Sequence, residues 1–275
     1  TGLDLVELMI RVAAGEKLPL TQAEVKKEGW AIECRINAED PFRNFLPSTG
    51  RLVRFSPPEQ SLFQGQATTD LGVRVDTGVV EGGEIPMHYD SMIAKLIVHG
   101  KDRNDAIAKM RQALNGFVIR GISSNIPFQA ALLAHPKFVT GDFNTGFIAE
   151  HYGSGFHAED VPHDDPNLLA AIAAFVRRKS RERTKGLSGQ LPGYGVRVGK
   201  DYTVIVLDHV DGKHRYLNAS IEELKGLEGQ GKALISIAGK TYDIESNSRL
   251  NDIAISGNIN GAPFVAQVER GQGKN

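Results

Sequence analysis

Residues 30–47 read WAIECRINAEDPFRNFLP, and this stretch decides how the first half of the chain folds. Apolar and polar residues alternate from 30 to 37, which predicts a strand with one buried face. The apolar face would hold Trp30, Ile32, Cys34 and Ile36. Arg35 then projects from the opposite face, beside Glu33 and Asn37. Such a face is either a salt-bridged surface or one wall of an active site, and the pattern alone leaves both open.

The composition excludes several classes of protein. The chain has 275 residues, of which 41% are hydrophobic and 24% charged, so it can form two domains with separate cores. Its net charge of −1 provides no field for nucleic acid or an acidic membrane, and we expect neither as a partner. The single cysteine, Cys34, rules out an intrachain disulfide and a cysteine cluster for a metal, and we expect no metal site. No apolar run approaches the roughly 20 residues of a membrane span.

The first residues, TGLDLVELMIRVAAGEKL, predict an amphipathic helix already in progress. Gly15 provides a natural end for it. Its apolar stripe consists of Leu3, Val6, Met9, Ile10 and Ala13. Because the sequence starts without methionine, we expect Thr1 to be a cut point in a longer polypeptide.

The rest of the first half predicts an α+β fold, a small antiparallel sheet packed with helices. Short strands are expected at 30–37, 51–55, 72–75 and 93–98, separated by turn residues. Residues 102–114 predict a helix that buries Ile107, Met110 and Leu114, and 126–133 predict another. We place the first domain at residues 1–152.

The second half predicts a different architecture. Residues 153–167 are rich in Gly, Pro and acidic residues and read as a linker. A long helix is expected at 168–185. From 196 onward, short alternating runs with Gly, Asp or Asn turns predict a small antiparallel β-barrel, and the second domain would span residues 168–275. We expect the barrel to be cut short.

The long helix ends in the basic run RRKSRER at 177–183. A nucleic-acid patch is one interpretation, but the run has no interleaved aromatic residues. Basic residues at the end of a helix also suit the helix dipole, and we favour that ordinary explanation.

No standard catalytic motif occurs in the sequence. Two local clusters remain as candidates. The first is Arg35, in ECRINAEDP, and the second is Asp90, at the entrance of a strand in HYDSMIAKL. Both residue types on strand edges are more often solvated ion pairs than functional groups.

A resemblance raises the odds for both candidates. The chain resembles the C-terminal subdomain of biotin carboxylases almost continuously over residues 1–150. The motifs are TGLDLVELMIRVAAGEKL, ECRINAEDPFRNFLPSTG, GVRVDTGV, YDSMIAKLIVHG and DRNDAIAKMRQAL. GLSGQLPGYGVRVG and SRLNDIAISGNINGAPFVAQVER look like the biotin-transfer domain of the propionyl-CoA carboxylase α-subunit family.

The resemblance implies an ATP-dependent ligase. Such enzymes use ATP, Mg²⁺ or Mn²⁺ and bicarbonate to carboxylate biotin on a carrier domain, and a β subunit then carboxylates propionyl-CoA. Carried over, Arg35 becomes a catalytic, biotin-binding residue whose guanidinium stabilises negative charge on the ureido oxygen. Asp90 becomes a second biotin-binding residue, which orients biotin or Arg35. The location would be a bacterial cytoplasm or a mitochondrial matrix.

The resemblance also implies what this chain lacks. The family's catalytic base and its ATP- and metal-binding groups would precede Thr1, and the biotinylation motif would follow Asn275. We therefore expect the fragment to be inactive by itself. A hook-like loop that docks the β subunit would correspond to Leu187, Ser188, Gly189, Gln190, Leu191 and Pro192.

A rival interpretation treats the chain as a subunit-docking scaffold with no catalytic role. For the loop, the corresponding alternative is an ordinary flexible connector. The scaffold and enzyme interpretations differ on Arg35, which only the enzyme requires.

Overall fold

The computed structural model describes residues 3–60, 62–63, 66–67, 72–162, 165–191, 193–207, 213–225, 231–269 and 271. Within these residues, no helix combines the length and apolar character needed to cross a membrane.

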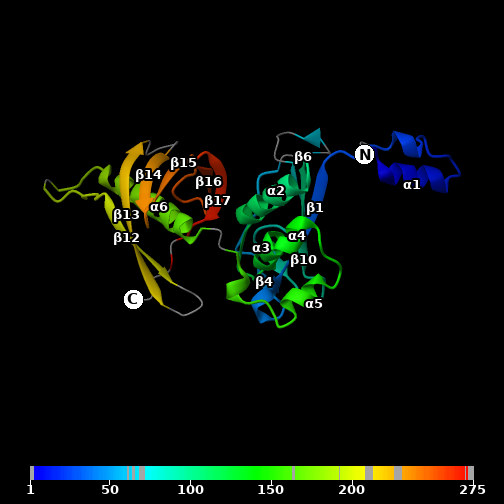
Figure 1. The fold of residues 1–275 in the computed structure, drawn as a ribbon, viewed down its shortest axis with the longest axis horizontal. Helices are drawn as coiled ribbons and strands as arrows, with labels where there is room; N and C mark the ends of the chain where they lie inside the picture. Colours follow the sequence, from blue (N-terminus) through cyan, green and yellow to red (C-terminus); the bar gives the residue numbers. More distant parts are fainter. Residues whose placement is uncertain are drawn as a thin grey trace.

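The first helix, α1 (Leu5–Ala13), lies at one end of the molecule (Figure 1). It begins at Asp4, whose Oδ1 accepts hydrogen bonds from the N–H groups of Val6 and Glu7, both at 3.0 Å. The predicted helix is confirmed, but none of its residues is buried, and Met9 is 70% exposed. An apolar stripe along one face is typical of a helix that packs against other parts of the protein. In the described residues, however, nothing covers the stripe of α1. A 3₁₀ turn, η1 (Gln22–Glu24), follows.

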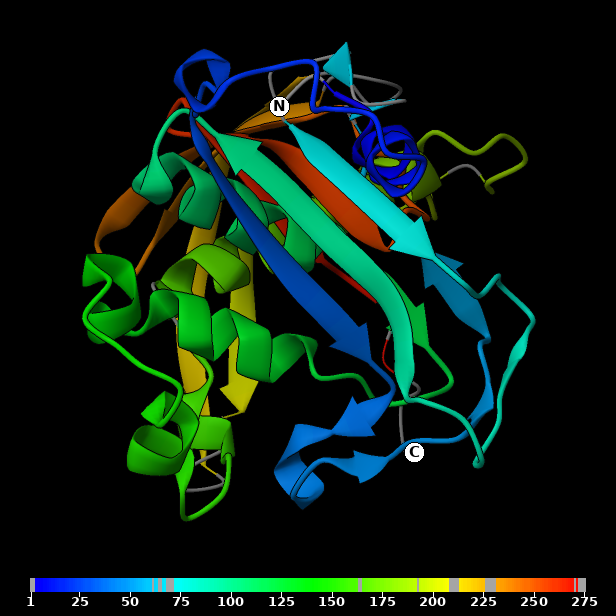
Figure 2. The same ribbon diagram turned by 90° about the vertical axis from the view of Figure 1, so that its right-hand side faces the viewer.

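The sheet of the first half joins β1 (Trp30–Asn37), β10 (Met92–Gly100) and β8 (Val73–Thr77) in that order, all antiparallel. Figure 2 shows the three strands side by side. The strand predicted at 30–37 is confirmed. Trp30, however, is 46% exposed and stacks under the guanidinium of Arg103, 5.5 Å from the ring centroid, instead of entering the core.

Helix α2 (Arg103–Gly116) packs on β10 and β1. The three residues expected on its buried face are buried: Ile107, Met110 and Leu114 are 6%, 0% and 1% exposed. They join Cys34, Ile36 and Leu96 in one core, which therefore lies between α2 and the inner face of the sheet.

Short two-stranded ladders surround this sheet. Two of them are local: β2 (Glu39–Asp40) pairs with β3 (Leu46–Pro47), and β6 (Leu62–Phe63) with β7 (Gln66–Ala67). The other two join segments far apart in the sequence: β4 (Gly50–Arg51) with β9 (Glu84–Ile85), and β5 (Arg54–Ser56) with β11 (Val118–Arg120). A 3₁₀ turn, η2 (Pro41–Arg43), separates β2 from β3. The strand predicted at 51–55 is split at Leu52, which is fully buried and exchanges backbone hydrogen bonds with Gly82 and Gly83.

Three short helices complete the first half: α3 (Ile126–Ala134), α4 (Pro136–Thr140) and α5 (Phe147–Tyr152), followed by the 3₁₀ turn η3 (Ala158–Asp160). Phe128 contacts Phe45, Tyr152 and Phe156 edge to face, with ring centroids 4.9–5.5 Å apart. Phe156 is only 2% exposed, so this part of the expected linker packs against the first half.

The second half consists of α6 (Pro166–Lys185) and a six-stranded antiparallel sheet in sequence order. The strands are β12 (Asp201–Leu207), β13 (His214–Lys225), β14 (Gly231–Ile237), β15 (Lys240–Ser246), β16 (Ala254–Ile259) and β17 (Ala262–Gln267). Residues 196–199, expected to be a strand, are not one.

The expected barrel is an open sheet in the described residues, because its end strands β12 and β17 do not pair with each other. Helix α6 takes up the interior instead. Phe175 and Ile172 are 1% and 2% exposed and pack among buried strand residues such as Ile235 and Ile244. The apolar face of the sheet is thus covered by a helix without the strands having to close.

Candidate functional site

Strand β1 presents different chemistry on its two faces. Cys34 and Ile36 point into the core, at 4% and 0% exposure. Arg35 points outward, and its Nε donates a 3.2 Å hydrogen bond to Oε1 of Glu33, two residues earlier on the same face. The side chain of Arg35 is 67% exposed. The predicted orientation of this arginine is therefore confirmed.

The outer face of the sheet is strongly charged around Arg35. The register places Arg35 opposite Lys95 of β10, and Lys95 opposite Asp76 of β8. Asp76 is occupied, because its two carboxylate oxygens accept from Nε and Nη2 of Arg74 at 2.8 and 2.7 Å. In the described residues, no ion pair or hydrogen bond engages the Lys95 ammonium. Within this part of the chain, the ammonium of Lys95 is thus an unpaired positive charge beside Arg35, and it suits an anion.

The guanidinium of Arg35 keeps part of its donor set free. Within the part of the chain that the structure describes, only Nε has a partner, and Nη1 and Nη2 bind no acceptor. Those two nitrogens form the planar fork that binds a carboxylate, a bicarbonate or a ureido oxygen with two parallel bonds. Glu33 orients the group without using that fork.

The backbone of Arg35 is held from the far side by α3. The carbonyl of Arg35 accepts from Nδ2 of Asn125 at 3.0 Å and from Nε2 of Gln129 at 3.3 Å. The N–H of Asn37 donates to Oδ1 of Asn125 at 2.9 Å, and the N–H of Asn125 donates to the carbonyl of Asn37 at 3.1 Å. Asn125 is 6% exposed, so this clamp is shielded from water.

Asp90 lies at the turn that leads into β10, and its Oδ1 accepts the N–H of Met92 at 3.0 Å. The neighbouring Ser91 carbonyl accepts the N–H of Ala38, which ties this turn to the end of β1. Asp90 is exposed and forms no hydrogen bond or ion pair with Arg35 in the described residues. The structure places the two predicted residues at the same end of one strand pair but gives Arg35 a different carboxylate partner, Glu33.

Cys34, next to Arg35 in sequence, offers no second chemistry at this site. Burial, followed by the nearby charge of Glu33, raises the pKa of its thiol to about 12. The thiolate is the nucleophilic form, so this cysteine is inert at neutral pH.

The expected docking loop follows α6 and is organised by Gln190. Its Nε2 donates to the carbonyls of Thr184, Lys185 and Leu187 at 3.0 Å each, which caps the end of the helix. Its Oε1 accepts the N–H of Val196 at 2.9 Å, closing the loop on itself.

The apolar residues of the same loop face solvent. Leu187, Leu191 and Tyr194 are 59%, 70% and 84% exposed. Ser188 and Gly189 lie between the leucines, and Pro192 lies outside the described residues. A loop that holds its polar atoms internally and its apolar side chains outward has the character of an interface anchor.

Comparison with known proteins decides the family. The model of the biotin carboxylase C-terminal domain matches residues 33–150, and that of the propionyl-coenzyme A carboxylase BT domain matches 169–274. The propionyl-CoA carboxylase alpha chain of Ruegeria pomeroyi is 49% identical over 214 residues, covering 74% of this chain and 31% of that protein. The chain belongs to the family of propionyl-CoA carboxylase alpha chains.

Two further similarities are to a second alpha chain and to a solved structure. The mitochondrial propionyl-CoA carboxylase alpha chain of Caenorhabditis briggsae is 35% identical over 274 residues, 98% of this chain and 36% of that protein. Among solved structures, the biotin carboxylase domain dimer of Hydrogenobacter thermophilus 2-oxoglutarate carboxylase, with MgADP, ADP and bicarbonate, is 36% identical. The similarity covers 60% of this chain and 33% of that one, with a TM-score of 0.49. The chain spans about a third of the length of the relatives it matches.

Propionyl-CoA carboxylase alpha chains thus share both matched regions with this chain. Arg35 and Asp90 fall in the biotin carboxylase region, and the loop of Gln190 falls in the BT region. Sequence reasoning missed Asn125 and Gln129. The only local signal for Asn125 was its place in SSNIP, at the start of a helix. Because Asn125 follows Arg35 by 90 positions in the sequence, no local pattern predicts their contact.

Proposed function

We propose that this chain supplies one wall of a biotin carboxylase site and a docking loop for a β subunit, within an ATP-dependent ligase that carboxylates carrier-bound biotin for transfer to propionyl-CoA. The observation that carries the proposal, within the described residues, is the free fork of Arg35 beside the unpaired ammonium of Lys95. The similarity to propionyl-CoA carboxylase alpha chains supports the reaction class.

Arg35 is the proposed catalytic residue of this wall. Bound biotin supplies the ureido nitrogen that accepts the carboxyl group. With biotin bound, Nη1 and Nη2 of Arg35 would hold its ureido oxygen and would stabilise negative charge there. The Asn125 clamp holds the backbone of Arg35, and Glu33 accepts from Nε, so both contacts favour an orientation in which Nη1 and Nη2 are free.

Asp90 is proposed as a second biotin-binding residue. Its Oδ1 is engaged with the Met92 N–H, and its second oxygen is available to a ligand group. A carboxylate accepts hydrogen bonds, so it would bind an N–H of the ureido ring.

We propose that other parts of a longer polypeptide bind the remaining reactants. The described residues contain no group of three or more His, Cys, Asp or Glu that could hold a metal. ATP and Mg²⁺ or Mn²⁺ would be bound upstream, and biotin would arrive on a carrier domain. The fragment alone would then be inactive. We propose the division 1–152, 153–167 and 168–275, and a bacterial cytoplasm or mitochondrial matrix as the location.

The docking role rests on Leu187, Leu191 and the intervening Ser188, Gly189 and Gln190, with Pro192 included by resemblance. Gln190 preorganises the loop, so binding costs less conformational entropy. A docking scaffold without a catalytic role is the second candidate function. The exposed apolar side chains of this loop support docking in both candidates, so they do not distinguish the two.

Replacing Arg35 separates the two candidates. In an alpha chain that contains this segment, Arg35→Ala should lower the rate of biotin carboxylation by on the order of 10²–10³, because one oxyanion donor is lost. Bicarbonate-dependent turnover of ATP with free biotin measures this. Arg54→Ala is the matched control: its exposed ion pair with Glu81 (3.2 Å) is similar, but it lies outside the site. An equal, small effect of both changes would leave only the scaffold.

The docking loop has its own test. Leu187→Ser with Leu191→Ser should weaken binding of the β subunit by roughly tenfold or more, because fully burying each leucine side chain contributes about 1.5–3 kcal/mol. Surface plasmon resonance with purified β subunit measures the change. The control is Leu207→Ser, a 47% exposed leucine on β12. Unchanged affinity in the loop variant would refute the docking role while leaving the Arg35 proposal intact.

A further inference from the structure

The two halves of the chain meet where α2 ends. Gln267, the last residue of β17, reaches across from the six-stranded sheet, and its Nε2 donates to the carbonyls of Asn115 and Phe117 at 2.9 and 3.0 Å. The last carbonyls of a helix have no partner within the helix. Gln267 therefore caps a helix of the first half from a strand of the second, about 150 residues later in the sequence.

Arg120 completes the contact from the strand that follows α2. Its Nη2 donates to Oε1 of Gln267 at 2.8 Å, and its Nε donates to Oε1 of Glu269 at 2.6 Å. Its Nη1 donates to the carbonyl of Ile119 at 2.7 Å, which holds the guanidinium in place. Both polar atoms of the Gln267 amide are used, and only one amide orientation satisfies two carbonyls and a guanidinium together.

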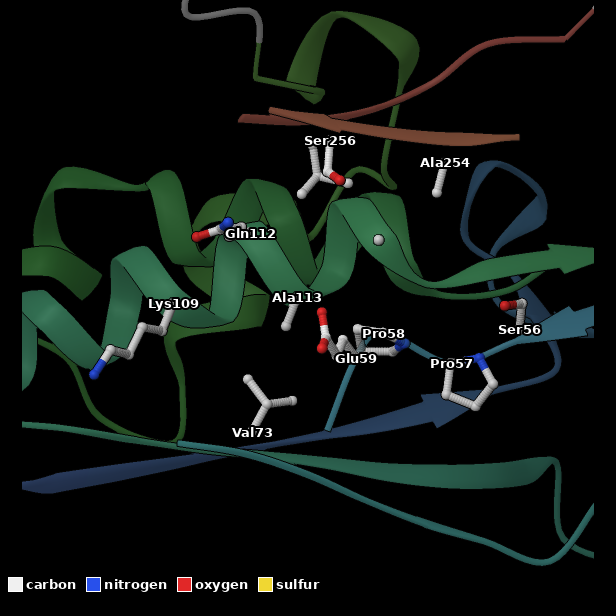
Figure 3. Close-up of a pocket in the computed structure, with 12 residues that line it drawn as sticks. Ser56, Pro57, Pro58, Glu59, Val73, Lys109, Gln112, Ala113, Ala254 and Ser256 are labelled. Atoms are coloured by element: carbon white, nitrogen blue, oxygen red, sulfur yellow. The ribbon is translucent and has the colours of Figure 1, made fainter. Parts of the chain in front are cut away.

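Behind these hydrogen bonds the two halves do not close completely. A pocket of about 220 Å³ lies between α2, the turn at 56–59 and the strands β16 and β17 (Figure 3). At the edge of the pocket the two halves come close: a Cβ built on Gly116 would lie 3.5 Å from Cβ of Pro58 and 3.7 Å from Cγ1 of Val265, both ordinary van der Waals distances. The hollow interrupts the apolar contact between the halves, and the hydrogen bonds of Gln267 and Arg120 lie beside it.

We propose that Gln267, Arg120 and Glu269 form a latch that sets how the six-stranded sheet is placed against α2. Helix α2 packs on β1 and β10, so the latch also fixes the sheet relative to the strands of Arg35 and Asp90. The latch rests on contacts within the chain and does not depend on the proposed function. Its consequence is a defined separation between the wall of Arg35 and the docking loop beyond α6.

Distance distributions between two spin labels test the latch in the full 275-residue chain. Val80→Cys and Tyr216→Cys place one label on each half, at sites 72% and 67% exposed, while Cys34 is 4% exposed and stays unlabelled. Pulsed electron paramagnetic resonance should give one narrow distance distribution for the labelled parent. Gln267→Ala and Arg120→Ala should each broaden it, with about a tenfold fall in the ratio of closed to open molecules, since each removes two or more hydrogen bonds.

Two further variants make the result specific. Gln267→Glu keeps the length but sets an oxygen against two carbonyls, so it should broaden the distribution as the alanine does. Arg74→Ala removes an exposed ion pair, with Asp76 at 2.7 Å, that lies within β8 of the first half and away from Arg120, and it should leave the distance distribution narrow. Circular dichroism confirms that each variant is folded. A broad parent distribution, unchanged widths in Gln267→Ala and Arg120→Ala, or equal broadening in Arg74→Ala would overturn the latch.

Discussion

Neighbouring residues of β1 have opposite roles because a strand alternates its faces. Cys34 is packed against the core of α2, while Arg35 stands in solvent with two unbound donor nitrogens. Glu33 serves both residues: it orients the guanidinium of Arg35, and its charge adds to the burial that raises the pKa of Cys34. The reactive group at this position is therefore the arginine.

The thiol of Cys34 should not react in the folded chain. Its pKa of about 12 leaves almost no thiolate at pH 7.5, and burial excludes reagents. Titration with Ellman's reagent should find essentially no thiol without denaturant and one thiol per chain in guanidinium chloride. Rapid labelling of the native chain, at the rate of the denatured one, would contradict the packing of β1.

Helix α6 is joined to its sheet through its first turn. Asp165 accepts the N–H of Asn167 at 3.0 Å as N-cap, and its Oδ2 accepts from Tyr242 at 2.9 Å and Lys240 at 3.1 Å. Burial raises the pKa of Asp165, but these hydrogen bonds outweigh that effect and hold the pKa below its ordinary value. One side chain thus starts the helix and fastens it to β15.

Asp165→Ala should lower the free energy of unfolding by about 1–2 kcal/mol at pH 7, the usual loss for a helix cap. Because the folded pKa lies below the unfolded one, the carboxylate stabilises the fold above about pH 4 and loses this effect as the pH falls through the folded pKa. Urea unfolding at pH 7, 5 and 3.5 measures the difference from the parent, which should shrink at the lowest pH. Asp165→Asn, which keeps the cap, should cost less; a larger cost would contradict the capping role.

Elements with a strong local period could be predicted from the sequence, and those made by distant contacts could not. The alternation around Arg35 predicts β1, and the spacing of Ile107, Met110 and Leu114 predicts α2. No local pattern links Arg54–Ser56 to Val118–Arg120, which form a ladder only after the chain has folded between them. The pattern also predicts buried positions for the apolar stripe of α1 and for Trp30, and both are exposed. An amphipathic pattern shows which side chains are apolar, but not whether another part of the chain covers them.

For the candidate site, the sequence predicts the direction of Arg35 but not its supports. Asn125 and Gln129 are polar residues at the start of a helix, and nothing near them in sequence marks them as holding the Arg35 carbonyl. The same limit applies to the barrel. Its strands alternate as expected, but whether they close depends on α6 filling the interior, which is a property of packing.

At the scale of the whole molecule, two halves with separate cores are joined through one end of α2 and connected by chain from Tyr152 to α6. The proposed catalytic arginine lies in the first half and the proposed docking loop in the second. A reaction shared between a carboxylating site and a partner subunit needs both, at a defined separation. The central claim is that Arg35 acts through its planar fork.

The most direct measurement of that claim compares Arg35→Lys with Arg35→Ala in an alpha chain that contains this segment, by the rate of bicarbonate-dependent biotin carboxylation. Lysine keeps the positive charge but provides a point donor without the two parallel N–H groups. Arg35→Ala is expected to lower the rate by on the order of 10²–10³, and we predict that Arg35→Lys recovers little of this loss. The melting temperatures of both variants should stay near that of the parent. Carboxylation close to the parental rate in Arg35→Lys would contradict the account.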